Sequence, residues 1–184
     1  MIKEVIKAKK NSIACIAIGN TFYNAWTKNI LPSWKLYCKK NDLGLIVFTE
    51  DLIDKKDNYW KKPTWQRCLV GTKVQEAFPI VKNICVMDID ILINPYSPNI
   101  FKEVDFEKIN LTSLRKKLPY DYNFTTKKLA YFRRLLLNPE YPLDSFLHCS
   151  LKTLYKFEKL PAQSDELNVG VLVFNLKKFA KKIE

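Results

Sequence analysis

The sequence predicts an α/β fold, with a mostly parallel central sheet flanked by helices in a single domain. Short apolar runs rich in β-branched residues are typical of strands that are covered on both faces. Four such runs occur, at residues 12–19, 43–49, 84–87 and 167–175. Segments with helical spacing separate the first three runs, and this alternation implies parallel pairing in a doubly wound sheet. The 184 residues, 47% of them apolar, are enough for one domain with its own core.

Two strands and one helix account for the beginning of the chain. Ser12 to Gly19 is expected as a buried first strand, and Asn20 to Tyr23 as the loop after it. Apolar residues at helical spacing predict a helix from Asn24 to Lys40, which Pro32 kinks or splits because proline cannot donate a backbone hydrogen bond. Leu43 to Thr49 is the second strand.

A polar, lysine-rich loop from Glu50 to Lys62 leads into the second helix. Pro63 suits the first position of a helix, and the helical pattern continues to Ala77. The third strand then ends at Asp88. Because ligands bind beyond the carboxyl ends of the strands in such sheets, Gly19 and Asp88 are expected beside the site.

The second half of the chain carries one clear strand and several less regular segments. Its final strand, LNVGVLVFN, precedes a basic helix that ends the chain. The expected elements are a turn with a short helical piece at 94–101, a strand within 106–114, helices at 125–137 and 143–159, the strand at 167–175 and a helix from 176.

Asp88 and Asp90 stand one residue apart within the apolar segment KNICVMDIDILIN. An ionised carboxylate in such surroundings needs a partner, because its desolvation is otherwise unfavourable. Residues two apart in an extended or sharply turned segment project to the same side, so both carboxylates can reach one hard cation, Mg²⁺ or Mn²⁺. The alternative is that the two acids pair with Lys or Arg at the strand end.

The formal charge of +12 is compatible with nucleic acid, an anionic membrane surface or phosphate-bearing substrates. Because the lysines are spread along the chain, we interpret the charge as an anion-friendly surface and expect no nucleic-acid partner. The N-terminus is too charged for a signal peptide, and no apolar run reaches the roughly 20 residues of a transmembrane helix. We therefore expect a soluble, cytoplasmic protein.

The five cysteines are odd in number, widely separated and without CxxC spacing. This pattern predicts reduced, mostly buried thiols and no zinc site.

Four segments together resemble the GT-A glycosyltransferases, in particular the nucleotide-sugar transferases with a DxD motif. They are AIGNTFY after the first strand, WQR in the second helix, VMDIDILINPYSPNIF around the two acids, and NVGVLVFN in the last strand. The resemblance spans 12–175. It implies a Rossmann-like GT-A catalytic domain covering 1–184, alone or as one domain of a longer protein.

By this resemblance, the exit of the first strand holds the base and ribose of a nucleotide. The residues concerned are Ala17, Ile18, Gly19 and Tyr23, with Gly19 allowing a close backbone approach. For Tyr23, packing of the ring under the loop is the alternative. Arg67 corresponds to a basic residue that contacts the donor and the acidic pair, since a guanidinium suits phosphate and carboxylate; an exposed helix arginine is the competing interpretation.

The resemblance also assigns roles to the acidic corner, which is the pair Asp88 and Asp90, and to the last strand. In Asp88–Ile89–Asp90, which lies along the donor, Asp88 contacts the sugar, the ribose or a metal-bound water, and Asp90 ligates the metal. Asn168 and Gly170 border the sugar and acceptor, although a strand glycine also serves close packing.

An inverting enzyme needs a carboxylate base near the acceptor hydroxyl. Asp165 and Glu166 are the candidates, with a surface turn as the alternative for each. The metal-binding histidine that many relatives place after the NxG strand is missing, and His148, the only histidine, is expected as an ordinary helix residue.

The implied activity is a manganese- or magnesium-dependent transfer of a sugar, of hexosyltransferase type, from a nucleoside diphosphate sugar to a hydroxyl of a glycan or glycoprotein. Uridine is the nucleoside that the resemblance favours. Three alternatives stay open: a phosphohydrolase of the haloacid-dehalogenase type that uses the DxD, a basic nucleic-acid-binding module, and a transferase fold that binds nucleotide sugar without turnover.

Overall fold

The computed structural model describes residues 1–113, 121, 124, 151–161 and 167–184. The chain divides into two compact units, Met1–Leu111 with Gly170–Glu184, and Thr112–Val169. In the second unit the described helix is α6, Leu151–Phe157, which lies within the helix expected at 143–159. The helix expected at 125–137 lies outside the described residues. The expectation of one domain across the chain stays a prediction.

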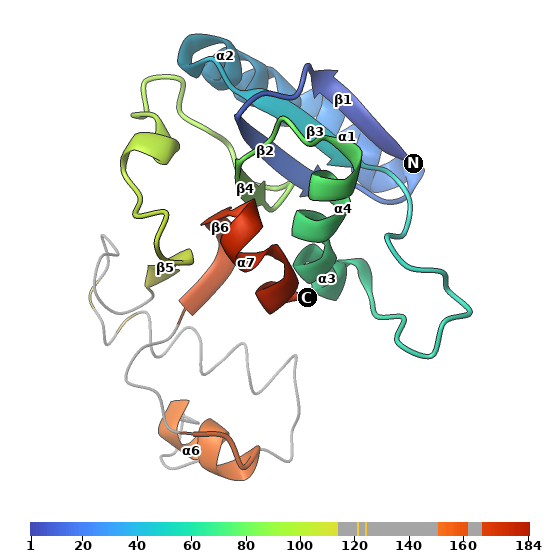
Figure 1. Cartoon of the computed structure of the whole chain (residues 1–184), viewed down its shortest axis with the longest axis vertical. Coiled ribbons are helices and arrows are strands. Elements are labelled where there is room, and N and C mark those ends of the chain that lie inside the picture. Colours follow the sequence, from blue (N-terminus) through green and yellow to red (C-terminus); the bar gives the residue numbers. More distant parts are fainter. Residues whose placement is uncertain (114–120, 122–123, 125–150, 162–166) are drawn as a thin grey trace. The chain divides into compact units, whose positions relative to one another are not determined.

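Six strands form one sheet in the order β1-β3-β2-β4-β6-β5 (Figure 1). Four of them match the predicted strands closely, β5 lies within the strand expected at 106–114, and β1 at the edge was not expected from the charged N-terminus. The bounds are Ile2–Ile6 for β1, Asn11–Ile16 for β2, Gly44–Phe48 for β3, Asn83–Met87 for β4, Asn110–Ser113 for β5 and Leu167–Asn175 for β6.

The sheet is mixed, which corrects the expectation of a mostly parallel sheet. The three central strands, β3, β2 and β4, pair in parallel as the strand and helix alternation predicted. β1 pairs antiparallel with β3, and β6 pairs antiparallel with β4. The reason for the first is connectivity: β1 precedes β2 without a crossover helix, whereas helices join β2 to β3 and β3 to β4.

The helix predicted at 24–40 is two helices, α1 at Asn20–Asn29 and α2 at Leu31–Asn41. Pro32 lies in the first turn of α2, where a missing N–H costs nothing, so the split occurs at Ile30. The loop expected at Asn20–Tyr23 is wrong, because these residues form the first turn of α1. Gly19 precedes this turn with a φ of 88°, a backbone conformation that favours glycine.

The helix predicted from Pro63 is present but changes pitch. It consists of α3 at Pro63–Gln66, the 3₁₀ segment η1 at Arg67–Leu69 and α4 at Val70–Ala77. The short helical piece expected before 101 is η2 at Ile100–Lys102. The terminal helix is confirmed as α7 at Leu176–Ile183, and the Asn175 side chain accepts a hydrogen bond from the Lys178 N–H at its start.

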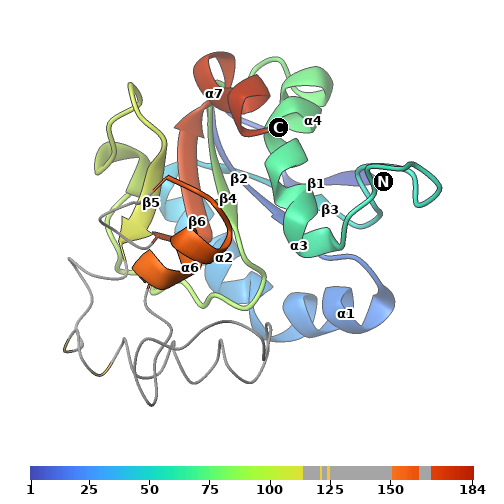
Figure 2. The same cartoon turned by 90° about the horizontal axis from the view of Figure 1, so that it is seen from below.

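The strands carry two hydrophobic clusters, one on each face of the sheet. α4 and α7 cover the face that includes Val86 and Phe174, whereas α1 and α2 cover the face that includes Cys85 and Met87 (Figure 2). Neighbouring residues of β4 therefore point to opposite clusters, as the side-chain period of a strand requires. This burial on both faces explains why the strands read as continuous apolar runs.

Three asparagines join β2, β4 and β6 at the amino end of the parallel strands. Asn83 Nδ2 donates to Asn11 Oδ1 over 2.9 Å, and Asn175 Nδ2 donates to Asn83 Oδ1 over 3.0 Å. Gly44 begins β3 at the same end, and a Cβ there would lie 2.4 Å from Ser12 Oγ and 2.8 Å from the Lys9 nitrogen. Close packing therefore requires glycine at this position.

The cysteines agree with the expectation of reduced thiols. Cys15, Cys38 and Cys85 are buried and free, and Cys68 is free and partly buried. Burial raises the pKa of the Cys38 and Cys85 thiols to about 12. Cys149 lies outside the described residues. Within the part of the chain that the structure describes, no helix combines the length and apolar character needed to cross a bilayer.

Candidate functional site

A pocket of about 680 Å³ opens at the carboxyl ends of β2 and β4. These two parallel strands are neighbours: from β2 the chain runs to β3 on one side, and from β3 it crosses to β4 on the other side of β2. A point where the strand order reverses in this way leaves a crevice in which α/β proteins bind ligands. The pocket therefore lies where the strand pattern of the sequence predicted a site.

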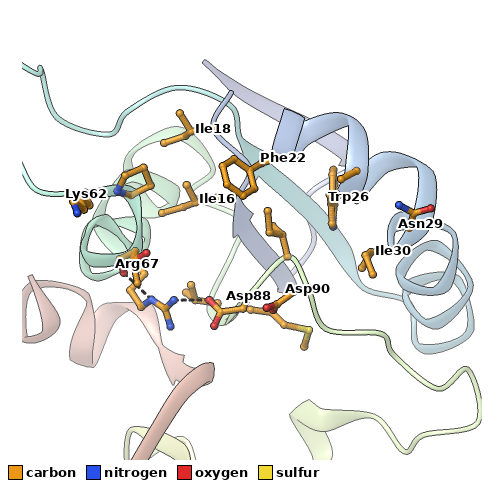
Figure 3. Close-up of a pocket in the computed structure, with 16 residues that line it drawn as sticks. Ile16, Ile18, Phe22, Trp26, Asn29, Ile30, Lys62, Arg67, Asp88 and Asp90 are labelled. Atoms are coloured by element: carbon orange, nitrogen blue, oxygen red, sulfur yellow. Dashed lines mark hydrogen bonds and ion pairs between the residues drawn. The ribbon is translucent and has the colours of Figure 1, made fainter. Parts of the chain in front are cut away.

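The pocket has two chemically different walls (Figure 3). One wall is mainly apolar and comes from the end of β2 and one face of α1; its residues are Ile16, Ile18, Phe22, Ala25, Trp26, Asn29 and Ile30. The other carries charged groups from the start of α3, from η1 and from the end of β4; its residues include Lys62, Arg67, Asp88 and Asp90. Such a pocket suits a ligand with an uncharged ring at one end and a charged group at the other.

Arg67 and Asp88 form an ion pair across the charged wall. Arg67 Nη2 donates to Asp88 Oδ1 over 2.5 Å, and Arg67 Nε donates to the Thr64 carbonyl over 2.9 Å. The Arg67 side chain is only 13% exposed, so its position is fixed by these contacts. For Asp88, this pair is the arrangement that the alternative interpretation described, an acid paired with Arg at a strand end, and the binding of a hard cation beside it stays a prediction.

The pKa of the Asp88 carboxyl is shifted in both directions by its surroundings. Partial burial is the strongest and raises its pKa, the charge of Arg67 lowers it, and the charge of Asp90 raises it again. The net result is a raised pKa. Its backbone is fixed as well, because the Asp88 N–H donates to the Gly170 carbonyl over 2.9 Å. β6 thereby holds the carboxyl end of β4 in place.

Asp90 differs from Asp88 in being exposed at the rim of the pocket. Among the described residues, no hydrogen bond or ion pair engages its carboxylate. Since the Asp90 charge disfavours ionisation of Asp88, the two carboxylates lie close enough to interact electrostatically. An added cation would stabilise both negative charges at once.

The acidic corner fits a hard divalent cation in its ligand type. Mg²⁺ and Mn²⁺ prefer carboxylate oxygens, and Mg²⁺ is often held by one or two carboxylates, with water and substrate phosphates completing the shell. Across 1–113, 121, 124, 151–161 and 167–184, no group of three or more His, Cys, Asp or Glu side chains could hold a metal. A cation here would therefore depend on its substrate for further ligands.

The four residues expected to hold the nucleotide have different surroundings. Ile18 lines the pocket, whereas Ala17 is fully buried and its N–H donates to the Phe48 carbonyl over 2.8 Å. Gly19 precedes α1. Tyr23 packs its ring 6.1 Å from that of Trp26, and the Lys3 ammonium lies 4.9 Å from the Tyr23 ring centroid. The structure thus favours the packing interpretation of Tyr23.

The later candidates are only partly described. Gly170 is buried and its carbonyl anchors Asp88, which is a packing role. Ile89 lines the pocket between the two acids, and Asn168 is exposed in β6. Asp165, Glu166 and His148 lie outside the described residues.

Several pocket residues were not identified from the sequence. Phe22, Trp26 and Asn29 recur at helical spacing on one face of α1, but Phe22 was placed in the expected loop and Trp26 served only to predict a helix. Trp26 is 1% exposed, and its indole N–H is buried without a hydrogen-bond partner among the described residues. Lys62 was placed in a loop without a role. Only the fold shows that both segments face the same pocket.

No model of a known protein family matches the chain, and no curated protein matches it either. Among solved structures, the chain is similar to the crystal structure of a glycosyltransferase involved in the glycosylation of the major capsid of PBCV-1. The two share 12% sequence identity over 94% of this chain and 98% of that chain, with a TM-score of 0.41.

Proposed function

We propose that the protein is a divalent-metal-dependent glycosyltransferase that uses a nucleoside diphosphate sugar. The donor is a uridine diphosphate sugar, and the acceptor is a hydroxyl group of a glycan or glycoprotein. The observation that carries this proposal is the charged corner at the rim of the pocket, in which Asp90 is exposed beside the Arg67–Asp88 pair. A diphosphate and a cation together would satisfy all three charged groups.

The two walls of the pocket bind different parts of the donor. The apolar wall receives the uncharged base, because its aliphatic and aromatic side chains offer area for ring packing. The charged wall receives the diphosphate, with Lys62 and Arg67 supplying positive charge. Arg67 is prepared for this contact because Asp88 and the Thr64 carbonyl already orient its guanidinium.

Asp88 and Asp90 would hold the metal, with Asp90 as the direct ligand. A divalent cation at that place supplies Lewis-acid stabilisation of the negative charge on the departing diphosphate. Asp88 orients Arg67, and Asp90 contributes an oxygen donor that needs no rearrangement of the fold, because it is already exposed. We further propose Asp165 or Glu166 as the base that accepts the proton of the acceptor hydroxyl.

The decisive experiment measures thermal stabilisation by a panel of nucleotide sugars with and without Mn²⁺, because a ligand that binds the native state raises the melting temperature. We expect a uridine diphosphate sugar to stabilise the protein only when Mn²⁺ is present. Asp90→Ala should abolish this effect and keep the melting temperature of the free protein, since Asp90 is exposed.

Glu103→Ala is the matched control, because it removes one exposed acid outside the pocket. Its manganese-dependent stabilisation should equal that of the wild type. Unchanged stabilisation of the Asp90→Ala variant would contradict the proposal. Hydrolysis of phosphate esters without sugar transfer would instead support the phosphohydrolase alternative.

A further inference from the structure

The loop between β3 and α3 is held in shape by a polar clasp centred on Gln66. Gln66 is 1% exposed, and its amide Nε2 donates to Asp51 Oδ1 over 2.6 Å and to the Lys61 carbonyl over 2.8 Å. Its Oε1 accepts a hydrogen bond from the Leu52 N–H over 2.7 Å. One buried side chain thus ties both ends of the loop to the first turn of α3, and its donors and acceptor are all engaged.

Asp51 completes the clasp. Its carboxylate accepts from the Trp60 indole Nε1 over 3.3 Å and forms an ion pair with Lys55 at 3.6 Å. Trp60 is therefore anchored to the loop by its polar edge and partly buried. The clasp accounts for one aromatic residue of this segment, while no hydrogen bond from a described residue anchors the side chain of Tyr59 or Trp65.

Trp65 is the exposed member of the four tryptophans. Trp26 and Trp34 are buried in the core and Trp60 is anchored by Asp51, but Trp65 is 69% exposed. Tyr59 in the same clasped segment is 80% exposed. Large aromatic side chains gain most by burial, so an exposed indole on an ordered turn next to pocket residues is a candidate ligand contact.

Consecutive side chains of α3 and the start of η1 point in three directions. Thr64 and Arg67 line the pocket, Gln66 faces the interior, and Trp65 faces solvent. Trp65 therefore lies in the chain between two pocket residues without lining the pocket itself. Because the clasp fixes this turn, the indole is presented at a constant place relative to the charged wall.

We propose that Trp65, on the turn that the clasp orders, is the platform on which a sugar ring of the acceptor stacks. The proposal rests on the proposed function, because a stacked acceptor at the rim would lie next to the donor. A pyranose ring presents a face of C–H groups with partial positive charge, and the face of an indole is negative, so the two attract each other. The exposed face is that of one indole, which matches a single sugar ring better than a broad apolar partner surface.

The test uses the whole chain labelled with 5-fluorotryptophan, which gives one fluorine resonance for each of the four tryptophans. Trp65→Phe identifies the Trp65 resonance by its loss. The labelled protein is titrated with methyl glycosides of common hexoses and N-acetylhexosamines. We expect at least one glycoside to shift the Trp65 resonance and to leave those of Trp26 and Trp34 unchanged.

The affinity for that glycoside is then measured by calorimetry in three variants. Trp65→Ala should weaken binding about tenfold, a change that one stacked aromatic pair can supply. Trp65→Phe should retain most of the affinity because an aromatic face remains. Tyr96→Ala, which removes an aromatic ring that is 88% exposed outside the pocket, should change nothing.

The proposal is overturned if no glycoside of the panel shifts the Trp65 resonance, or if Trp65→Ala binds as tightly as the wild type. The proposed function fails in a different way, namely by loss of manganese-dependent binding of nucleotide sugars. A Trp65→Ala variant that keeps donor binding and loses glycoside binding supports both the stacking platform and the proposed function.

Discussion

The two ends of the central parallel strands use polar side chains in opposite ways. At the amino end, Asn11, Asn83 and Asn175 satisfy one another across three strands, and Asn83 is only 7% exposed. At the carboxyl end, Arg67 is the one side chain among the described residues that pairs with Asp88, and Asp90 is exposed. Satisfied polar groups hold the register of the sheet, whereas incompletely satisfied charges are available to a ligand.

The largest effect on stability is expected at the amino end, from Asn83→Ala. The substitution leaves Asn11 Oδ1 and Asn175 Nδ2 without their partners, and unpaired polar groups of this kind together cost about 3 kcal/mol of unfolding free energy. Urea denaturation measures the loss. Asn58→Ala, in an exposed loop, is the control and should be nearly neutral. Unimpaired stability of Asn83→Ala would remove the contrast between the two ends.

At the carboxyl end, Arg67→Ala should act on binding. Loss of a charge-assisted contact to the diphosphate is expected to weaken manganese-dependent donor binding by about 1.5–3 kcal/mol, measured by calorimetry. Lys102→Ala removes one exposed positive charge outside the pocket and serves as the control. Equal affinity of the Arg67→Ala variant and the wild type would place the diphosphate elsewhere.

The smallest effects concern the titration of Asp88, whose carboxyl carbon can be followed by NMR in Arg67→Ala and Asp90→Asn. Arg67→Ala should raise the Asp88 pKa further, because the neighbouring positive charge is lost, and Asp90→Asn should lower it. Shifts in the opposite directions would show that other charges control Asp88.

The raised pKa of Asp88 also predicts the direction in which stability and manganese-dependent binding each change with pH. Between the ordinary aspartate pKa and the raised one, the folded state binds more protons than the unfolded state, so the contribution of Asp88 to stability falls as pH rises through this window. Metal binding requires the ionised form, so manganese-dependent binding should strengthen as pH rises through the same window.

The local elements could be predicted wherever burial on both faces left a continuous apolar run. The strand at 167–175 was predicted with its observed bounds, Pro63 marked a helix start correctly, and Pro32 was correctly expected to split the helix predicted at 24–40. β1 was missed because the sequence MIKEVIKAKK reads as charged, and an edge strand buries too little surface to leave a stronger pattern. The first turn of α1 was missed because its polar residues resemble a loop.

By itself, the sequence determined the central β-α-β-α-β unit and placed Asp88 and Asp90 at the end of a buried strand, since strand periodicity and the cost of a buried charge are local properties. Only the tertiary structure decided the partners of these acids and the mixed pairing of the sheet. Arg67 lies 21 residues from Asp88 in the chain, and Gly170 far beyond, yet both contact it. Such contacts depend on how strands and helices pack, which no local pattern specifies.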